Sequence, residues 1–319
     1  MPTFHDCSNS PKRPRHRGTG GPVENDCVRL IKRDAPLWGW WHVESIQKAD
    51  VLFTNDVWPD EALESKKPLV KRMDGTFWEK SLQDRNVPYN EAAEQSACVV
   101  FPSLFCKVCA TNSRWGEIQK PYAWFLAPNA ADPLVFHVKD YTRGNAFVAV
   151  ATDWTRPEKR GESLASVIEA LPDSNFVVIG KNFPETKTNN VVRTGYVDHQ
   201  IMAEIFNQSM AMINLSYRDP SPKVVAQAAA CGLHVLYADS GGTREMVLSG
   251  EPVHDDDGEH SDDAPPELDL GSVVAKAKGI AQRHGTTFSK RYIRRNATAR
   301  YSRMIESYAS AFEEALSNG

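Results

Sequence analysis

A run of 29 residues near the middle of the second half of this chain combines charge, glycine and helical periodicity in a way that suits an anionic ligand. It reads, over 219–247, as a charged loop, a short Ala-rich helix that ends at Gly232, an apolar strand and a Gly-Gly turn. The loop 219–223 then lies at a helix N-terminus, where backbone N–H groups and the helix dipole favour a phosphate or diphosphate. In an open α/β sheet, both this loop and the Gly241-Gly242 turn are expected at the ligand crevice.

A second charged segment carries three cations between a predicted strand at 146–152 and a predicted helix at 162–171. The cations are Arg156, Lys159 and Arg160. Positioned cations stabilise the negative charge that develops on a leaving diphosphate. A solvated surface loop is the alternative, but a place directly after a strand of a parallel sheet favours a ligand site. Lys159 and Arg160 are equally suited to act beside Arg156.

The stretch 219–247 resembles the donor-sugar signature of the retaining glycosyltransferases of family 4. That signature consists of an acid, a second acid on the following helix, Ala-x-Ala-x-Gly-x-Pro-Val, a strand and Gly-Gly-x-x-Glu. The residues at its positions here are Asp219, Gln227, Cys231, Gly232, Gly241, Gly242 and Glu245.

Two signature positions depart from the family pattern. Gln227 replaces the second carboxylate, and His234 stands where the family usually has proline. A glutamine amide can still hydrogen-bond a ribose hydroxyl, but without charge. These departures leave a degenerate, non-catalytic nucleotide-binding relative as an alternative to an enzyme.

The resemblance implies an α/β fold of the GT-B type, with two Rossmann-like domains, parallel sheets and an interdomain cleft. The alternation of short apolar runs with helical segments independently favours parallel α/β sheets. We expect an acceptor-side domain over 1–137 and a donor-binding domain over 138–299, with a last helix at 300–319 that packs back on the first domain. Further strands are expected at 49–56, 68–75, 98–103, 121–129, 175–180 and 211–216.

The resemblance also assigns roles around a nucleotide sugar. Arg156 with Lys159 or Arg160 would grip the diphosphate, Asp219 would approach the hydroxyls of the donor sugar, and a Gly195-Tyr196-Val197 loop would hold the nucleobase. An ordinary helix N-cap at Asp219 or Ser221 is compatible with these roles. The full expected donor-binding set is Lys159, Arg160, Gly195, Tyr196, Val197, Ser221, Pro222, Lys223, Val224 and Gln227.

On the acceptor side, the segment Arg-Met-Asp-Gly ends the strand predicted at 68–75. By resemblance, Asp74 would contact the acceptor hydroxyl and, with Asp219 and Arg156, complete the catalytic set, while Arg72 lies beside it. A simple turn at Asp74-Gly75 is the alternative. A glycine-rich turn with Gly20 and Gly21 is expected to line the cleft of the first domain.

The expected chemistry needs no tightly bound cofactor and no metal ion, with a UDP- or GDP-sugar as the donor substrate. The triplet at 255–257 lies in an acidic, proline-rich segment, 251–268, and is interpreted as solvated loop rather than a metal site. Cys106 and Cys109 are expected to pack on a helix, because a structural zinc site would need a second close pair.

The acceptor is open among several classes. Basic clusters at 11–17 and 290–295 would suit phosphate contacts to DNA, and compact phage enzymes that glycosylate hydroxymethylated pyrimidines resemble this family. A glycan, lipid or small molecule is the alternative acceptor, and a GT-B-like phosphorylase or epimerase the alternative enzyme. No apolar run reaches the length of a membrane span, and neither a span nor a secretory signal is expected, so the predicted location is cytoplasmic, or the host cytoplasm for a phage-encoded protein.

Overall fold

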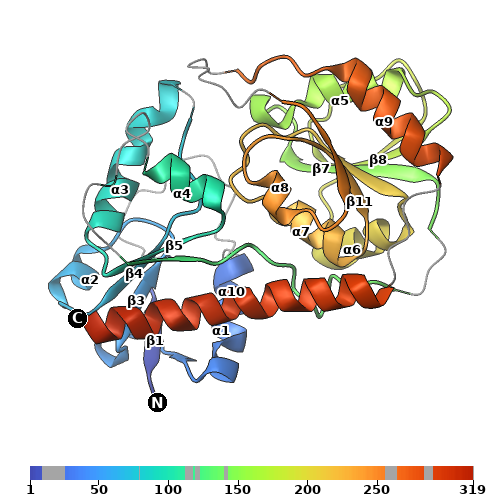
Figure 1. Ribbon diagram of the computed structural model, residues 1–319. Helices are drawn as coiled ribbons and strands as arrows, with labels where there is room; N and C mark the ends of the chain where they lie inside the picture. The colour runs from blue at the N-terminus through green and yellow to red at the C-terminus, as the bar shows by residue number, and fades with distance from the viewer. Residues whose placement is uncertain are drawn as a thin grey trace. The chain divides into compact units, whose positions relative to one another are not determined.

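The computed structural model describes residues 1–8, 26–78, 80–111, 118, 123–139, 143–255, 264–283 and 290–318. The chain forms two compact units, one of Met1–Asn129 with Ser302–Gly319 and one of Ala130–Tyr301. Each unit contains a six-stranded sheet with helices on its faces (Figure 1). The boundary comes before the predicted 137/138, because Ala131 and Phe136 already pack in the core of the second unit.

The sheet of the first unit has the strand order β2-β1-β3-β4-β5-β6, and its neighbours pair in parallel. Its strands are β1 (Thr3–Asp6), β2 (Trp41–His42), β3 (Val51–Thr54), β4 (Leu69–Arg72), β5 (Cys98–Phe101) and β6 (Ala123–Leu126). Its helices are α1 (Asp26–Asp34), η1 (Ala35–Trp38), η2 (Ile46–Lys48), α2 (Asp60–Glu64), η3 (Lys80–Arg85), α3 (Asn86–Glu94) and α4 (Leu104–Ala110).

Helices cover both faces of this first sheet, so β3, β4 and β5 are buried at every position. On one face the apolar side chains of α2, α3 and α4 pack on the strands. On the other, the last helix, α10 (Lys290–Asn318), contributes aromatic rings. Phe312 stacks on Phe4 with 4.9 Å between ring centroids, and Tyr308 meets Phe53 edge-on at 5.6 Å. Residues of α10 up to Tyr301 belong to the second unit and later ones to the first.

The sheet of the second unit has the strand order β12-β11-β10-β7-β8-β9, also with parallel neighbours. Its strands are β7 (Ala146–Asp153), β8 (Asn175–Lys181), β9 (Val191–Gly195), β10 (Ala211–Asn214), β11 (His234–Ala238) and β12 (Gly250–Val253). Its helices are η5 (Pro157–Lys159), α5 (Gly161–Glu169), α6 (His199–Gln208), α7 (Lys223–Ala230), α8 (Thr243–Met246) and α9 (Leu270–Gln282), followed by the start of α10.

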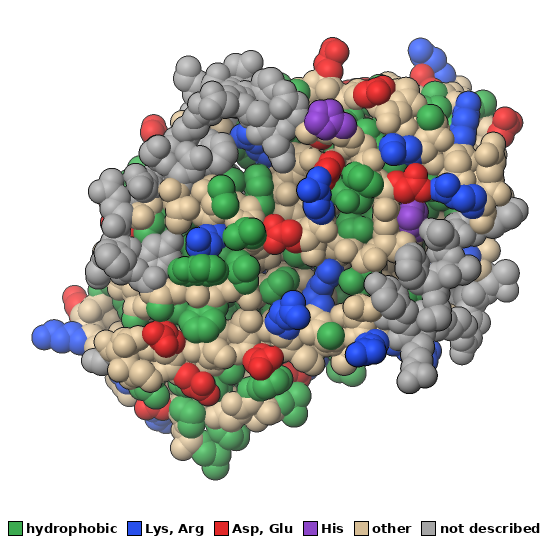
Figure 2. Space-filling model, in the orientation of Figure 1, with side chains coloured by type: hydrophobic (Ala, Val, Ile, Leu, Met, Phe, Trp, Pro, Cys, Tyr) green, Lys and Arg blue, Asp and Glu red, His purple; other side chains and the backbone are tan. Residues whose placement is uncertain are grey.

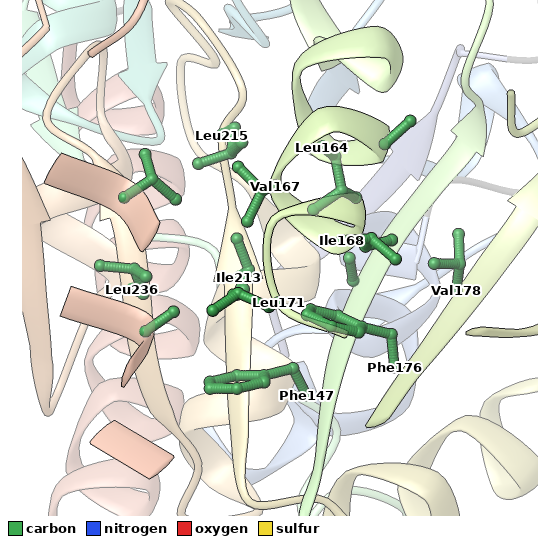
Figure 3. Close-up of a cluster of buried hydrophobic side chains, with 14 of the residues drawn as sticks. Phe147, Leu164, Val167, Ile168, Leu171, Phe176, Val178, Ile213, Leu215 and Leu236 are labelled. Carbon is green, nitrogen blue, oxygen red and sulfur yellow. The ribbon is translucent and has the colours of Figure 1, made fainter. Parts of the chain in front are cut away.

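Two apolar layers hold this sheet between its helices. Helices α5 and α9 lie over one face, and α6 and α7 over the other (Figure 1). In the first layer, Leu164 and Ile168 of α5 pack against Phe147, Phe176 and other strand residues (Figure 3). Because all strands are parallel, their carboxyl ends meet at one edge of the sheet, and the loops that follow the strands gather there.

The α/β alternation and the two parallel sheets confirm the predicted fold class. The segment 251–268, however, is not simply a surface loop, because its first residues complete the edge strand β12 beside β11. Within the described residues, no helix is both long and apolar enough to span a bilayer.

Candidate active site

The segment that follows β7 is fixed by close packing against β8. The indole Nε1 of Trp154 donates a hydrogen bond to the Ile179 carbonyl oxygen at 3.1 Å. Gly180 has a φ of +119°, and a Cβ atom there would lie 1.7 Å from the Ala151 carbonyl oxygen. Only glycine allows this approach of the two strands. The loop that begins at Trp154 therefore starts from a constrained backbone.

This loop meets the loop that precedes α7. The Lys159 ammonium contacts the Asp219 carboxylate at 2.8 Å, and both side chains are largely buried. One residue earlier, the Glu158 carbonyl oxygen accepts a hydrogen bond from the Tyr217 N–H at 2.8 Å. A cation and an acid that lie 60 residues apart in the sequence thus come together at the carboxyl edge of the second sheet.

The glycine turn after β11 closes against the same loop. The Gly242 N–H donates to the Asp219 carbonyl oxygen at 2.8 Å. Gly241 has a φ of +65°, and a Cβ atom there would lie 2.6 Å from that same oxygen and 2.8 Å from the carbonyl carbon of Arg218. The Gly-Gly element therefore supports the backbone of Asp219 directly.

Helix α7 begins at this point without a side-chain cap. Its N-cap is Pro222, which makes no side-chain cap hydrogen bond, while the Asp219 carboxylate accepts from the Ser221 N–H at 3.2 Å. The dipole of a helix favours an anion near its first turn, which here consists of Lys223 and Val224. Gln227 lies about one turn further along α7 and is buried.

The two arginines of the β7–α5 segment lie in different surroundings. Arg156 has a side chain that is 60% exposed and forms an ion pair with Glu158. Arg160 is buried and makes a two-pronged ion pair with Asp255, at 2.7 and 2.9 Å. The prediction that the acidic triplet is solvated is wrong for Asp255, whose side chain is fully buried, because this guanidinium supplies the partner that a buried carboxylate requires.

The Gly195-Tyr196-Val197 loop lies at the same edge, after β9. Gly195 has a φ of +68° with nothing within 4 Å of a built Cβ atom. The Tyr196 side chain is 76% exposed, whereas Val197 packs against the core of the unit. The loop thus presents an aromatic ring to solvent, and its contact with a nucleobase stays a prediction.

In the first unit, Asp74 is an oriented carboxylate after β4. It forms an ion pair with Arg72, and its other oxygen accepts from the Asn55 side-chain amide at 3.1 Å. Arg72 is fully buried and also donates to the hydroxyl of Tyr308 and, at 2.8 Å, to the amide oxygen of Asn129. Arg72 therefore serves as a structural anchor for Asp74, whose carboxylate remains 39% exposed.

A buried lysine accompanies this pair. Lys71 donates to the Arg72 carbonyl oxygen at 2.6 Å and lies 5.4 Å from the centroid of the Tyr89 ring. Burial lowers the pKa of Lys71 to about 8, although the carboxylates of Asp74 and Asp56 act in the opposite direction. The charge of this ammonium is therefore sensitive to its surroundings.

Several other predictions concern cysteines, metals and the first glycine turn. Cys106 and Cys109 are buried thiols on α4, as expected. Over the described ranges, no group of three or more His, Cys, Asp or Glu side chains is placed to hold a metal ion. Gly20 and Gly21 lie outside the described residues.

The sequence did not single out three residues that hold the loops together. They are Glu158, Tyr217 and Asp255, all buried. Glu158 and Tyr217 act through backbone groups or packing, which leave no signal in residue type. Asp255 could have been found by its place just after β12, since polar residues at the carboxyl ends of parallel strands often face the site.

Comparisons with known proteins give a family match for part of the chain and a shared fold for nearly all of it. Residues 146–261 match the family model described as glycosyl transferases group 1, whereas no curated protein sequence matches the chain significantly. The structure is similar to a sucrose-phosphate synthase from Thermosynechococcus elongatus, with a TM-score of 0.66 at 14% identity over 99% of this chain and 97% of that one. It is equally similar to Anabaena HepE in complex with UDP and glucose, with a TM-score of 0.66 at 12% identity over 98% and 99%.

A third similar structure is AviGT4, a glycosyltransferase involved in avilamycin A biosynthesis, with a TM-score of 0.59 at 13% identity over 100% and 99% of the two chains. Two Rossmann-like units with parallel sheets, shared with these structures, define the GT-B fold. The chain has this fold, and its residues 146–261 match the glycosyl transferases group 1 family model.

Proposed function

We propose that this enzyme transfers a sugar from a nucleoside diphosphate sugar to an acceptor hydroxyl with retention of anomeric configuration, and that the donor binds in the unit Ala130–Tyr301. The observation that carries the proposal is the meeting of Lys159 and Asp219 at 2.8 Å, beside the start of α7. A cation, a carboxylate and a helix N-terminus at one edge of a sheet match the needs of a sugar diphosphate.

Each of these groups has a task in the transfer. As the bond between the anomeric carbon and the diphosphate breaks, negative charge grows on the leaving oxygen. Lys159, the exposed Arg156 and the first turn of α7 would stabilise that charge by fixed electrostatics. Asp219 would accept hydrogen bonds from sugar hydroxyls, and the leaving phosphate oxygen would take the acceptor proton on the same face.

The donor is proposed to be a UDP-sugar. Two of the similar structures, both of Anabaena HepE, contain UDP with glucose and UDP-glucose. The arrangement at Lys159 and Arg156 provides cations for the diphosphate, so we expect turnover without an added metal ion. Gln227, buried on α7, is the candidate partner for a ribose hydroxyl.

The acceptor hydroxyl is assigned to Asp74 in the first unit, because Arg72 and Asn55 orient its partly exposed carboxylate. DNA as acceptor rests on the basic clusters. The cluster 11–17 lies outside the described residues, and Arg294 of the second cluster donates to the Val138 carbonyl oxygen. On the face shown in Figure 2, the described Lys and Arg side chains are interspersed with Asp and Glu. The proposed acceptor group is therefore a hydroxyl, and DNA is one of the acceptor classes that the assay compares.

The first test is ligand-induced thermal stabilisation with UDP, GDP and ADP. A ligand at 100 times its dissociation constant adds about 2.7 kcal/mol of stability, so binding is readily detected. We expect a shift with UDP that Asp219→Ala retains in part and that Arg156→Ala with Lys159→Ala abolishes. No shift with any of the three nucleotides would contradict the proposal and favour a degenerate relative.

The second test identifies reaction and acceptor. The enzyme is incubated with UDP-sugars and, in parallel, hydroxymethylated DNA, oligosaccharides and small alcohols, in the presence of a metal chelator. We expect UDP release that depends on one acceptor class, with a product whose anomeric configuration equals that of the donor. Inversion of configuration would refute the retaining mechanism, and release of UDP in the presence of water alone would refute transfer.

A further inference from the structure

The guanidinium of Arg160 donates hydrogen bonds to several segments of the second unit. Besides its two bonds to Asp255, it donates to the Leu215 carbonyl oxygen at 3.3 Å and to the Pro266 carbonyl oxygen at 2.9 Å. It also lies over the Tyr217 ring, 5.2 Å from the centroid. The residues it reaches follow β10 and β12 and precede α9, so one side chain joins three segments at the carboxyl edge of the sheet.

The two residues before Arg160 make further ties between the two donor loops, which are the segment that follows β7 and the segment that precedes α7. The Tyr217 N–H donates to the Glu158 carbonyl oxygen at 2.8 Å, and Lys159 contacts Asp219 at 2.8 Å. Their partners in the second loop, Leu215 for Arg160, Tyr217 for Glu158 and Asp219 for Lys159, are spaced two residues apart. A shift of Arg160 would therefore change the spacing between the diphosphate cations and the Asp219 loop.

We propose that Arg160 and Asp255 form a positioning pair, which sets the distance between the two donor loops, and that Arg160 does not bind the donor diphosphate. This inference rests on the proposed function of those loops. The Arg160 side chain is 3% exposed and that of Asp255 is fully buried. To reach a phosphate, Arg160 would have to break a bidentate pair and leave a buried carboxylate without its partner, which is strongly unfavourable. Lys159 then supplies the second cation beside Arg156.

The experiment compares three variants: Arg160→Lys, which keeps the charge but loses the fork, the isosteric Asp255→Asn, and the double variant. For each, UDP affinity and the KM values for donor and acceptor are measured well below the unfolding temperature. Hydrogen exchange at the Tyr217 amide reports on the tie between the loops without any ligand. The control is Arg143→Lys, since Arg143 is a guanidinium that bonds the carbonyl oxygens of Phe206, Ser209 and Cys231 at the opposite edge of the sheet.

A positioning pair predicts similar losses for both single variants, about ten- to hundredfold in kcat/KM for the donor, with no further loss in the double variant. The acceptor KM should be unchanged, and Tyr217 should exchange faster in all three but not in Arg143→Lys. Normal UDP affinity in Asp255→Asn together with weak affinity in Arg160→Lys would overturn the proposal and make Arg160 a donor ligand.

Unchanged exchange at Tyr217 would overturn it as well, whatever the kinetics. If the wild type bound no nucleotide, the proposed function would fail on its own, and the exchange measurement would still decide whether the pair holds the loops. Should Asp255→Asn not fold, Arg160→Lys and an Asp255→Glu variant, which retains the charge at a changed length, give the same comparison.

Discussion

Replacement of Gly241 by alanine tests whether the glycine turn supports the donor loop. The new Cβ atom would lie 2.6 Å from the Asp219 carbonyl oxygen and within 3 Å of two backbone atoms of Arg218, none of which is the end of a flexible side chain. An alanine at positive φ costs about 1–2 kcal/mol, and forced contact in a packed site about 1–3 kcal/mol more. We therefore expect the free energy of unfolding of this unit to fall by about 2–5 kcal/mol.

The matched control is Gly195→Ala in the same unit. Gly195 has nearly the same φ, +68° against +65°, but a Cβ atom there meets nothing within 4 Å, so its cost is the backbone term of about 1–2 kcal/mol alone. Urea denaturation of both variants, followed by a probe in the second unit, gives the difference. Because Asp219 would have to move to relieve the contact, Gly241→Ala should also lower kcat/KM for the donor. Equal stability of the two variants, with normal donor kinetics in Gly241→Ala, would refute this reasoning.

Other substitutions test charge and burial at the two candidate sites. Asp219→Asn and Arg156→Ala should each reduce turnover about 10²-fold in steady-state assays, and wild-type rates in both would remove them from the site. The pKa of Lys71 is lowered from 10.5 to about 8, so between these pH values the unfolded chain binds more protons than the folded one. The wild type should therefore gain roughly 3 kcal/mol of stability relative to Lys71→Met as the pH rises through this window. If the free energies of unfolding of the two proteins, measured against pH, followed parallel curves, the burial of a charged ammonium at Lys71 would be contradicted. Gln227→Glu should destabilise the ligand-free protein, because Gln227 is buried and a carboxylate there loses hydration, yet it should bind UDP about fivefold more tightly through a charge-assisted hydrogen bond. Calorimetric titration checks the second expectation, and weaker binding would exclude Gln227 from contact with the ribose.

The elements that position the candidate site could be predicted because their signals are local. Apolar runs at 146–152, 175–180 and 211–216 became β7, β8 and β10, since a buried parallel strand needs apolar side chains on both faces. The rule that ligands bind at the carboxyl ends of such strands predicts Lys159 and Asp219 at one edge of the sheet. Their functional role still stays a prediction.

What could not be predicted depends on contacts between distant segments. The edge strand β12, Gly250–Val253, is short and only partly buried, so its sequence lacks the apolar run that reveals a central strand. Likewise, the sequence could not decide whether Arg160 or Lys159 acts beside Arg156, because both are cations in one loop. Their difference arises from Asp255, which lies 95 residues from Arg160 along the chain and was interpreted as part of a solvated acidic run.

Arg160 also departs from local rules in its backbone. It lies at φ +52° in the left-handed region, at the N-cap of α5, without a side-chain cap, and non-glycine residues held there cost about 1–3 kcal/mol. Its ion pair with Asp255 adds the desolvation of two charges, which such pairs often fail to offset. Neither feature increases stability in an obvious way, but both act at the residue that ties Leu215 and Pro266 to the segment after β7. Backbone strain and a buried ion pair at one residue are the pattern expected where precise placement of neighbouring groups matters more than stability.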